Sequence, residues 1–157
     1  MSDAPAPSFT FGPDPDLPGW DRWTISDPTR FNSLFGPLAV KLEDGIARVR
    51  FVPGHIHTNL RGHVHGGALL GFIDMALFAA GRSFGVLSAG TAATLDLTTQ
   101  FIAGAPLEEG PVEARVELLR ETGRLLFMRG LIVQGETADA PLIVSFTGTI
   151  RKPSPTK

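Results

Sequence analysis

The sequence predicts an α+β domain in which an antiparallel sheet curls around one long buried helix. The stretch 66–81 is apolar on every side of a helix, which indicates a helix buried all round. The segments before and after it have the length and composition of strands. Short turns join these strands and favour antiparallel pairing, because parallel pairs need long crossovers. A sheet wrapped around the helix covers both apolar surfaces.

The other elements can be predicted in chain order from their turn signals. Asp27 and Pro28 offer an N-cap followed by a first-turn proline, so a short helix is expected over residues 28–34. Asp44-Gly45 is a strong hairpin signal between two strands. The predicted strands are 40–43, 46–52, 91–102, 111–120, 124–134 and 141–151.

Proline-rich and polar segments at the two ends divide the chain into three parts. Residues 1–27 are expected to form an extended, proline-rich arm, residues 28–152 the folded domain, and residues 153–157 a frayed tail. Trp20 and Trp23 lie in the arm. We expect these two rings to pack over the edge of a subunit or a pocket.

The composition is that of one ordinary globular domain and excludes several classes of function. The chain has 157 residues, of which 43% are apolar and 19% charged. A net charge of −2 provides no basic field for nucleic acid, and the absence of cysteine excludes disulfides and thiolate chemistry. The start of the chain shows no basic and apolar leader, and the longest apolar stretch is too short to cross a bilayer. We therefore expect a cytoplasmic protein with no membrane partner.

Asp74 is the only charged residue between His65 and Arg82, and it lies in the middle of the predicted apolar helix. Burying a lone carboxylate there costs on the order of several kcal/mol unless it is hydrogen-bonded, paired or open to a cavity. Two interpretations are open at this point. Asp74 is either a structural carboxylate paired with another element or part of a functional site.

The triplet His65-Gly66-Gly67 opens the helix and favours the functional interpretation. Glycines let the backbone approach a ligand, and the free N–H groups of a helix N-terminus suit a developing oxyanion. Asp74 lies eight residues after Gly66, which is about 12 Å along a helix axis and too far for both groups to act on one carbonyl. The sequence therefore predicts a site shared by two subunits across a two-fold axis.

Asn59, His65-Gly66-Gly67 and Asp74 together resemble the PaaI-like group of hotdog-fold acyl-CoA thioesterases. In that group an Asn, a short spacer, His-Gly-Gly and an Asp within the helix have matching spacings. Residues 94–101 are similar to the family strand after the helix, and residues 121–124 to the turn of its final hairpin. The resemblance extends over about residues 31–152 and implies the hotdog fold.

The resemblance implies a role for each matching residue. Asp74 would be the nucleophile or the general base that activates water, and the Gly66 N–H would polarise the thioester carbonyl. Asn59 would position the water or the carboxylate, and His65 would orient the loop and the substrate carbonyl. Thr94 would help to hold the attacking water. The family site lies at a dimer interface, and many members are tetramers, which implies a homotetramer built as a dimer of dimers.

The substrate implied by the resemblance is an acyl-CoA, with no cofactor. Gly67 would lie beside the substrate at the helix start. Arginine and lysine suit phosphate recognition, so the candidates for binding the phosphates of coenzyme A are Arg120, Arg124 and Lys152. The alternative for these three is that they are solvated charges at strand ends.

Two competing motifs carry less weight. Gly81-Arg82-Ser83-Phe84-Gly85 matches a nucleophile elbow, but that motif needs a preceding strand and a downstream histidine, and all four histidines precede Ser83. His55, His57, His63 and His65 raise the possibility of a metal site. No acidic residue follows them before Asp74, so we expect no metal.

Three functions remain open from the sequence. They are an acyl-CoA thioesterase, a hotdog protein that binds acyl-CoA without cutting it, and another hotdog enzyme, such as a dehydratase or a thioesterase that acts on acyl-carrier protein. Asp74, Asn59 and Thr94 together favour hydrolysis. The apolar helix residues favour a small, medium or aryl acyl group, or they simply form the core; they are Leu69, Phe72, Ile73 and Phe78.

Overall fold

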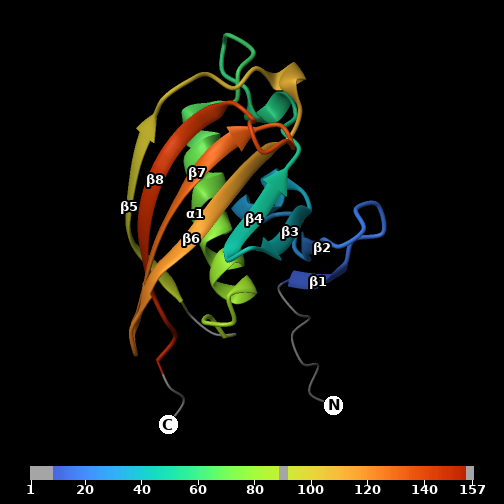
Figure 1. Ribbon diagram of the computed structural model, residues 1–157. Coiled ribbons are helices and arrows are strands. Elements are labelled where there is room, and N and C mark those ends of the chain that lie inside the picture. The colour runs from blue at the N-terminus through green and yellow to red at the C-terminus, as the bar shows by residue number, and fades with distance from the viewer. Residues whose placement is uncertain (1–8, 89–91, 155–157) are drawn as a thin grey trace.

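The computed structural model describes residues 9–88 and 92–154 and shows one long helix against an eight-stranded antiparallel sheet (Figure 1). The strand order is β1-β2-β3-β4-β6-β7-β8-β5. The strands are β1 (Phe9–Pro13), β2 (Asp21–Ile25), β3 (Leu38–Glu43), β4 (Ile46–Phe51), β5 (Ala93–Phe101), β6 (Val112–Glu121), β7 (Leu125–Gln134) and β8 (Leu142–Arg151). The helices are α1 (Gly66–Ser83) and three 3-10 helices, η1 (Phe31–Phe35), η2 (His55–His57) and η3 (Leu107–Glu109).

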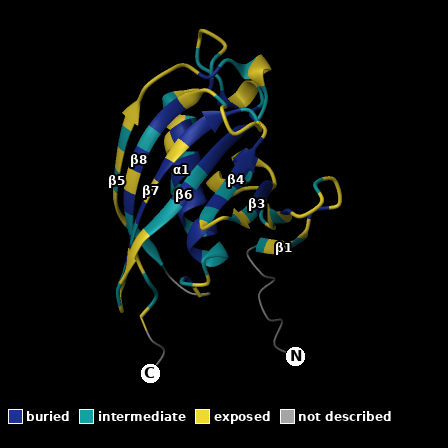
Figure 2. Cartoon of the chain, viewed as in Figure 1, coloured by how far each residue is buried: buried dark blue, intermediate teal, exposed yellow. Residues whose placement is uncertain are grey.

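The helix α1 is the centre of the core, as the sequence predicts. Its buried side chains include Phe72, Ile73 and Leu77, which pack with apolar residues of the sheet. The sheet curves around α1, and Figure 2 shows the helix and the middle strands as the buried part of the molecule. The α+β hotdog architecture is therefore confirmed. In the described ranges, no helix is both long and apolar enough to cross a membrane.

The N-terminal segment differs from the expected arm. Residues 9–25 contain β1 and β2, which form a hairpin and extend the sheet beside β3. Aromatic rings hold the hairpin together, because Phe9 stacks on Trp23 with 5.5 Å between ring centroids. The alternation of aromatic and polar residues around a proline-rich turn is the strand signal that the prolines obscure. The folded domain thus begins at least as early as Phe9; residues 1–8 and 155–157 of the predicted arm and tail lie outside the described residues.

The short helix expected over residues 28–34 is instead the 3-10 helix η1, over Phe31–Phe35. The Asp27 carboxylate accepts hydrogen bonds from the Thr29 backbone and hydroxyl, so it closes a local turn. This helix packs closely on α1 at Gly71, where an added Cβ would lie 3.0 Å from ring atoms of Phe31 and Phe35. As a result, η1 and the β1–β2 hairpin lie against the side of α1 that carries Asp74.

Candidate active site

Asp74 projects from the middle of α1 and is half-buried. Its Oδ1 accepts a hydrogen bond from the Thr94 hydroxyl at 2.5 Å. Within the described part of the chain, no lysine, arginine or histidine forms an ion pair with it, and its second oxygen has no hydrogen-bond partner. Asp74 lines a pocket of about 330 Å³. The carboxylate is thus fixed on one side and available on the other.

Thr94 reaches Asp74 from the beginning of β5, the edge strand beside β8. The same strand ends at Phe101, whose ring lies 3.4 Å from where a Cβ on Gly66 would be. The strand β5 therefore passes both candidate parts of the site, Asp74 at its start and the helix N-terminus at its end. Leu95 and Phe101 on this edge are 54% and 50% exposed.

The helix N-terminus is organised by His65. Its Nδ1 accepts a hydrogen bond from the Gly67 N–H at 2.8 Å, so His65 is the N-cap of α1. An unprotonated Nδ1 means that the neutral ring carries its proton on Nε2. The Gly66 N–H has no acceptor among the described residues. Two donors, the Gly66 N–H and the His65 Nε2–H, are thus available at the positive end of the helix dipole.

Asn59 holds the loop that leads into the helix. Its Oδ1 accepts hydrogen bonds from the backbone N–H groups of Arg61 at 2.9 Å and His63 at 3.2 Å. Its own backbone N–H donates to the His63 carbonyl. The side-chain carbonyl is therefore committed to the turn, while the side-chain amide has no partner in the described structure. Asn59 therefore lies near the start of α1 and not near Asp74 of the same chain.

Gly66 and Asp74 lie on one helix, so a single chain does not bring them together. Their separation of eight residues corresponds to about 12 Å along the axis. The structure thus pairs Thr94 with Asp74, and groups Asn59 and His65 with the glycines. The prediction that a second subunit completes the site stays a prediction.

Among the other histidines, His57 is buried and fully hydrogen-bonded. His57 is 8% exposed, and both its ring nitrogens are used: Nδ1 accepts from the Gly54 N–H and Nε2 donates to the Leu34 carbonyl. Its ring also stacks on Phe35 at 5.6 Å. His57 is therefore a core residue with no nitrogen free for a metal. Over residues 9–88 and 92–154, no three metal-ligating side chains gather.

Arg120, Arg124 and Lys152 gather at the end of the β6–β7 hairpin, which Figure 1 shows at the opposite end of the sheet from the start of α1. Arg120 and Arg124 are exposed. Lys152 forms a short ion pair with Glu121 and is less available for a phosphate. These three residues are therefore remote from Gly66 of their own chain.

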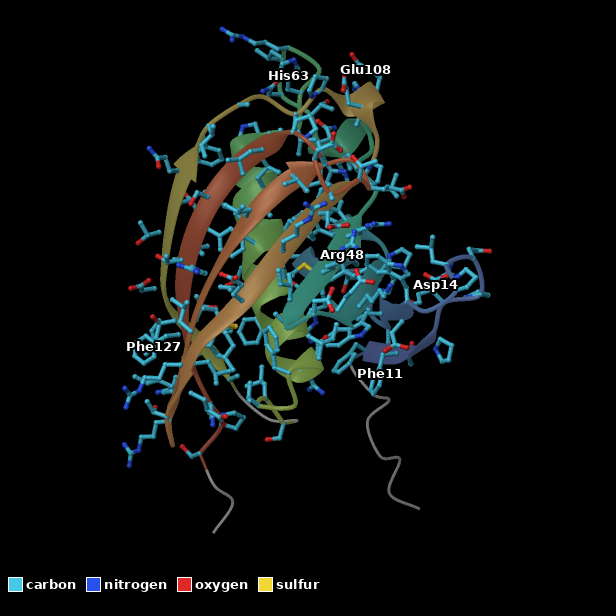
Figure 3. The ribbon with its side chains drawn as sticks, viewed as in Figure 1. Phe11, Asp14, Arg48, His63, Glu108 and Phe127 are labelled. Carbon is cyan, nitrogen blue, oxygen red and sulfur yellow. The ribbon has the colours of Figure 1, made fainter. Side chains whose placement is uncertain are left out.

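A second acidic group that the local sequence pattern does not reveal is Glu113 on β6, which is 0% exposed. It forms ion pairs with Arg48, Arg50 and Arg115. Arg48, labelled in Figure 3, alternates along β4 with the core residues Ala47 and Val49, so this cluster lies on the sheet face turned away from α1. Burial would raise the pKa of Glu113, but hydrogen bonds from the three arginines outweigh it and hold that pKa below its usual range.

Trp20 packs against the arginines of this cluster and does not line the pocket that contains Asp74. The guanidinium of Arg50 lies 4.1 Å from the Trp20 ring centroid, and that of Arg48 lies at 5.2 Å. Trp23, by contrast, lines the pocket that contains Asp74. The two tryptophans therefore fix the β1–β2 hairpin to the sheet and shape the pocket edge, respectively.

The hotdog architecture and the arrangement of the motif residues are consistent with the thioesterase class, and comparisons with known proteins identify the family. A sequence model described as the thioesterase superfamily matches residues 61–140, more than half of the chain. The chain therefore belongs to the thioesterase superfamily, in its PaaI-like group.

Solved structures give the same relationship. A mutant of the phenylacetic acid degradation protein PaaI from Thermus thermophilus is 27% identical with a TM-score of 0.61, over 80% of this chain and 99% of that one. A conserved protein from Pseudomonas aeruginosa is 26% identical with a TM-score of 0.61, over 78% and 93% of the two chains. A hypothetical thioesterase from Streptococcus pneumoniae, solved with coenzyme A, shares the fold at 20% identity and a TM-score of 0.64, over 78% and 93%. No curated protein matches the sequence.

Proposed function

We propose that this protein is a thioesterase that hydrolyses a small, medium or aryl acyl-CoA, with Asp74 as its central carboxylate. The observation that carries the proposal is the setting of Asp74. It lies in an otherwise apolar helix, is held by one hydroxyl, has no ion-pair partner among the described residues, and faces a pocket. A structural carboxylate in such a helix would be expected to have a cation or several donors.

Two chemical routes fit this setting. In the first, Asp74 takes a proton from water, and the resulting hydroxide attacks the thioester carbonyl. In the second, an Asp74 oxygen attacks the carbonyl to give a mixed anhydride, which water then cleaves. In both routes the C–S bond breaks, the thiolate of coenzyme A takes up a proton, and the free acid is released. The Thr94 hydroxyl fixes the carboxylate or the attacking water.

The carbonyl oxygen gains negative charge in both routes and needs fixed donors. The Gly66 N–H and the His65 Nε2–H are such donors at the start of α1. Gly67 beside them is held by the His65 cap and keeps the backbone open to the substrate. Asn59 supports this arrangement by fixing the preceding turn.

The path of β5 supports the proposal that two subunits share the site. This edge strand touches Asp74 through Thr94 at its start and Gly66 through Phe101 at its end. If two copies paired antiparallel along β5 about a two-fold axis, each start would meet the partner's end. Asp74 of one copy would then lie near Gly66 of the other. We propose a dimer through β5 and a tetramer of two such dimers.

Coenzyme A is the proposed carrier. The Streptococcus pneumoniae relative was solved with coenzyme A. Arg124 and Arg120 are exposed cations without ion-pair partners in the described structure, and we propose that they meet the phosphates, with Lys152 nearby. Arginine binds phosphate with paired donors, which suits this role.

The test is thiol release from a panel of acyl-CoAs that spans short, medium, long and aryl groups. Wild type and Asp74→Ala are measured side by side, with Asp139→Ala as a control that removes an exposed aspartate in the β7–β8 turn. We expect release by wild type and the control but not by Asp74→Ala. If wild type releases no thiol from any acyl-CoA, the thioesterase proposal fails. Binding of coenzyme A, followed by thermal melting, would then identify a non-catalytic binding protein.

A further inference from the structure

The pocket beside Asp74 is built jointly by α1 and the N-terminal hairpin. The residues of β1, β2 and the loop to β3 form one wall, and one face of α1 forms the other. The spacing of Asp74, Phe78 and Arg82, four residues apart, places them along this face. The lining residues are Phe9, Trp23, Ile25, Asn32, Gly36, Leu38, Asp74, Met75, Phe78 and Arg82.

Arg82 is the one basic side chain in this lining. Its guanidinium lies 4.6 Å from the Phe9 ring centroid. Among the described residues it forms no ion pair and donates no hydrogen bond, although it is half-buried. An arginine in the last turn of a helix also complements the helix dipole, but this guanidinium turns towards the hairpin rather than to the last carbonyls. It therefore presents unpaired donors at the pocket.

Asp74 and Arg82 stand at two positions along the pocket. Eight residues of helix separate them, which is about 12 Å along the axis, and Phe78 lies between them. A thioester carbonyl at Asp74 thus has apolar and aromatic surface along its acyl chain, followed by a cation. This order of surfaces along the pocket matches an acyl group that is apolar in the middle and anionic at its far end.

We infer that Arg82 binds an anionic group at the far end of the acyl chain, so that the preferred substrates are ω-carboxyacyl thioesters. The inference rests on the proposed thioesterase function and adds its substrate class. The β1–β2 hairpin contributes to this binding site, because the Phe9 ring contacts the guanidinium and Trp23 lines the side of the pocket. The hairpin lies outside residues 61–140, which match the superfamily, whereas Arg82 lies within them, so the proposed site combines α1 of the matched region with the N-terminal segment.

A phosphate of coenzyme A offers Arg82 the same anionic chemistry, and the choice of substrates separates the two sources. Adipyl-CoA and hexanoyl-CoA differ only in the terminal carboxylate. The same two acyl groups on N-acetylcysteamine lack every phosphate. If Arg82 contacts the terminal carboxylate, substituting it lowers the ratio of kcat/KM for adipyl over hexanoyl thioesters on both carriers. If Arg82 contacts a phosphate, substituting it lowers kcat/KM equally for both acyl groups, and only on coenzyme A.

The experiment measures kcat and KM of wild type, Arg82→Gln, Arg82→Lys and Phe9→Leu for these four thioesters. Arg129→Gln is the matched control, because Arg129 is an exposed arginine outside the pocket. We expect wild type to prefer the adipyl group. Arg82→Gln should reduce that preference about tenfold to a hundredfold, mainly through KM, since it removes a charge-assisted hydrogen bond. Arg82→Lys should retain part of the preference, and Phe9→Leu should lose part of it.

Thermal melting of each variant shows that the fold is retained, and Arg82→Lys provides a second test if Arg82→Gln does not fold. Equal loss for adipyl and hexanoyl groups on coenzyme A, with none on N-acetylcysteamine, would assign Arg82 to a phosphate and overturn the inference. Hydrolysis by wild type without a preference for adipyl groups would overturn it while leaving the thioesterase function intact. Failure of wild type to hydrolyse any of the thioesters would overturn both.

Discussion

Asp74 and Glu113 are two carboxylates in the same fold with opposite surroundings. Glu113 is fully buried on the outer face of the sheet, where three arginines surround it. Asp74 is half-buried beside a pocket and receives one hydroxyl hydrogen bond. The burial of Glu113 is therefore compensated within the chain, whereas Asp74 keeps an oxygen available for another molecule. The number of committed partners, more than the depth of burial, distinguishes the structural carboxylate Glu113 from Asp74, the proposed catalytic carboxylate.

The first test of this contrast is Asp74→Asn. The amide keeps the size of the side chain and can still accept from Thr94, but it cannot act as a base or a nucleophile. We expect turnover to fall by about a thousandfold, as for loss of a general base. The melting temperature should change little. Steady-state kinetics and thermal melting are measured on the same samples. Surviving activity would contradict the assignment, as would a loss of activity that is due only to unfolding of the protein.

The counterpart is Glu113→Gln, which should affect stability and leave turnover per folded molecule unchanged. Removing the carboxylate leaves Arg48, Arg50 and Arg115 together without their shared partner. We expect the free energy of unfolding to fall by about 3 kcal/mol, the scale for breaking a buried ion pair. Chemical denaturation measures this change. An unchanged midpoint would mean that the cluster is solvated and that the contrast with Asp74 does not hold.

The pH dependence of stability gives an independent view of Glu113. Burial favours a higher pKa, but the three arginines hold the pKa of the folded state below its ordinary value near 4.5. The stabilisation is therefore fully present above about pH 4.5 and is lost as the pH falls through the folded-state pKa. Glu113→Gln should lose less stability on acidification than wild type does. Denaturation curves from neutral pH downwards would contradict this if the two proteins lose stability in parallel.

The difference between these carboxylates also explains what the sequence could predict. A lone Asp74 in an apolar helix is visible in the sequence, as is the His65-Gly66-Gly67 start of that helix. The hairpin turn at Asp44-Gly45 and the strands after α1 are equally clear, so the central fold follows from local patterns. Glu113 lies among alternating charges, as any strand facing solvent would, so its burial is not encoded locally.

The rest depends on contacts between distant parts of the chain. The pairing of β1 with β2 requires aromatic stacking across a proline-rich turn, which local composition describes as an arm. Figure 3 labels Phe11 on this hairpin, at the lower right of the view, and His63 in the motif loop, at the top. Arg82 joins the pocket only because the hairpin folds back onto α1. The spacing of Arg82 from Asp74, which places both on one face of α1, is the sequence feature that indicates its place in the pocket.

Thr94→Val tests how firmly Asp74 is held. Valine keeps the shape of the side chain and removes the hydroxyl that donates to Asp74 Oδ1 at 2.5 Å. We expect turnover to fall by about tenfold, which corresponds to the loss of one neutral-donor hydrogen bond. Thr147→Val, at an exposed position on the neighbouring strand β8, is the control. A loss as large as that of Asp74→Asn would instead place the hydroxyl in the reaction itself.

The smallest expected effect is that of Asn59, and three substitutions separate its two possible contributions. Its Oδ1 accepts two backbone hydrogen bonds in the turn before the helix, while its amide group has no partner within the described structure. Asn59→Ala removes both and should destabilise the turn by about 1 kcal/mol, with a smaller loss of turnover than Asp74→Asn. Asn59→Asp keeps the acceptor, removes the amide donor and adds a negative charge, whereas Asn59→Ser keeps a neutral acceptor and removes the amide. If Asn59 acts through the turn, Asn59→Ser should retain near wild-type turnover. If its amide holds water or the partner's carboxylate, both variants should be as slow as Asn59→Ala while melting like wild type.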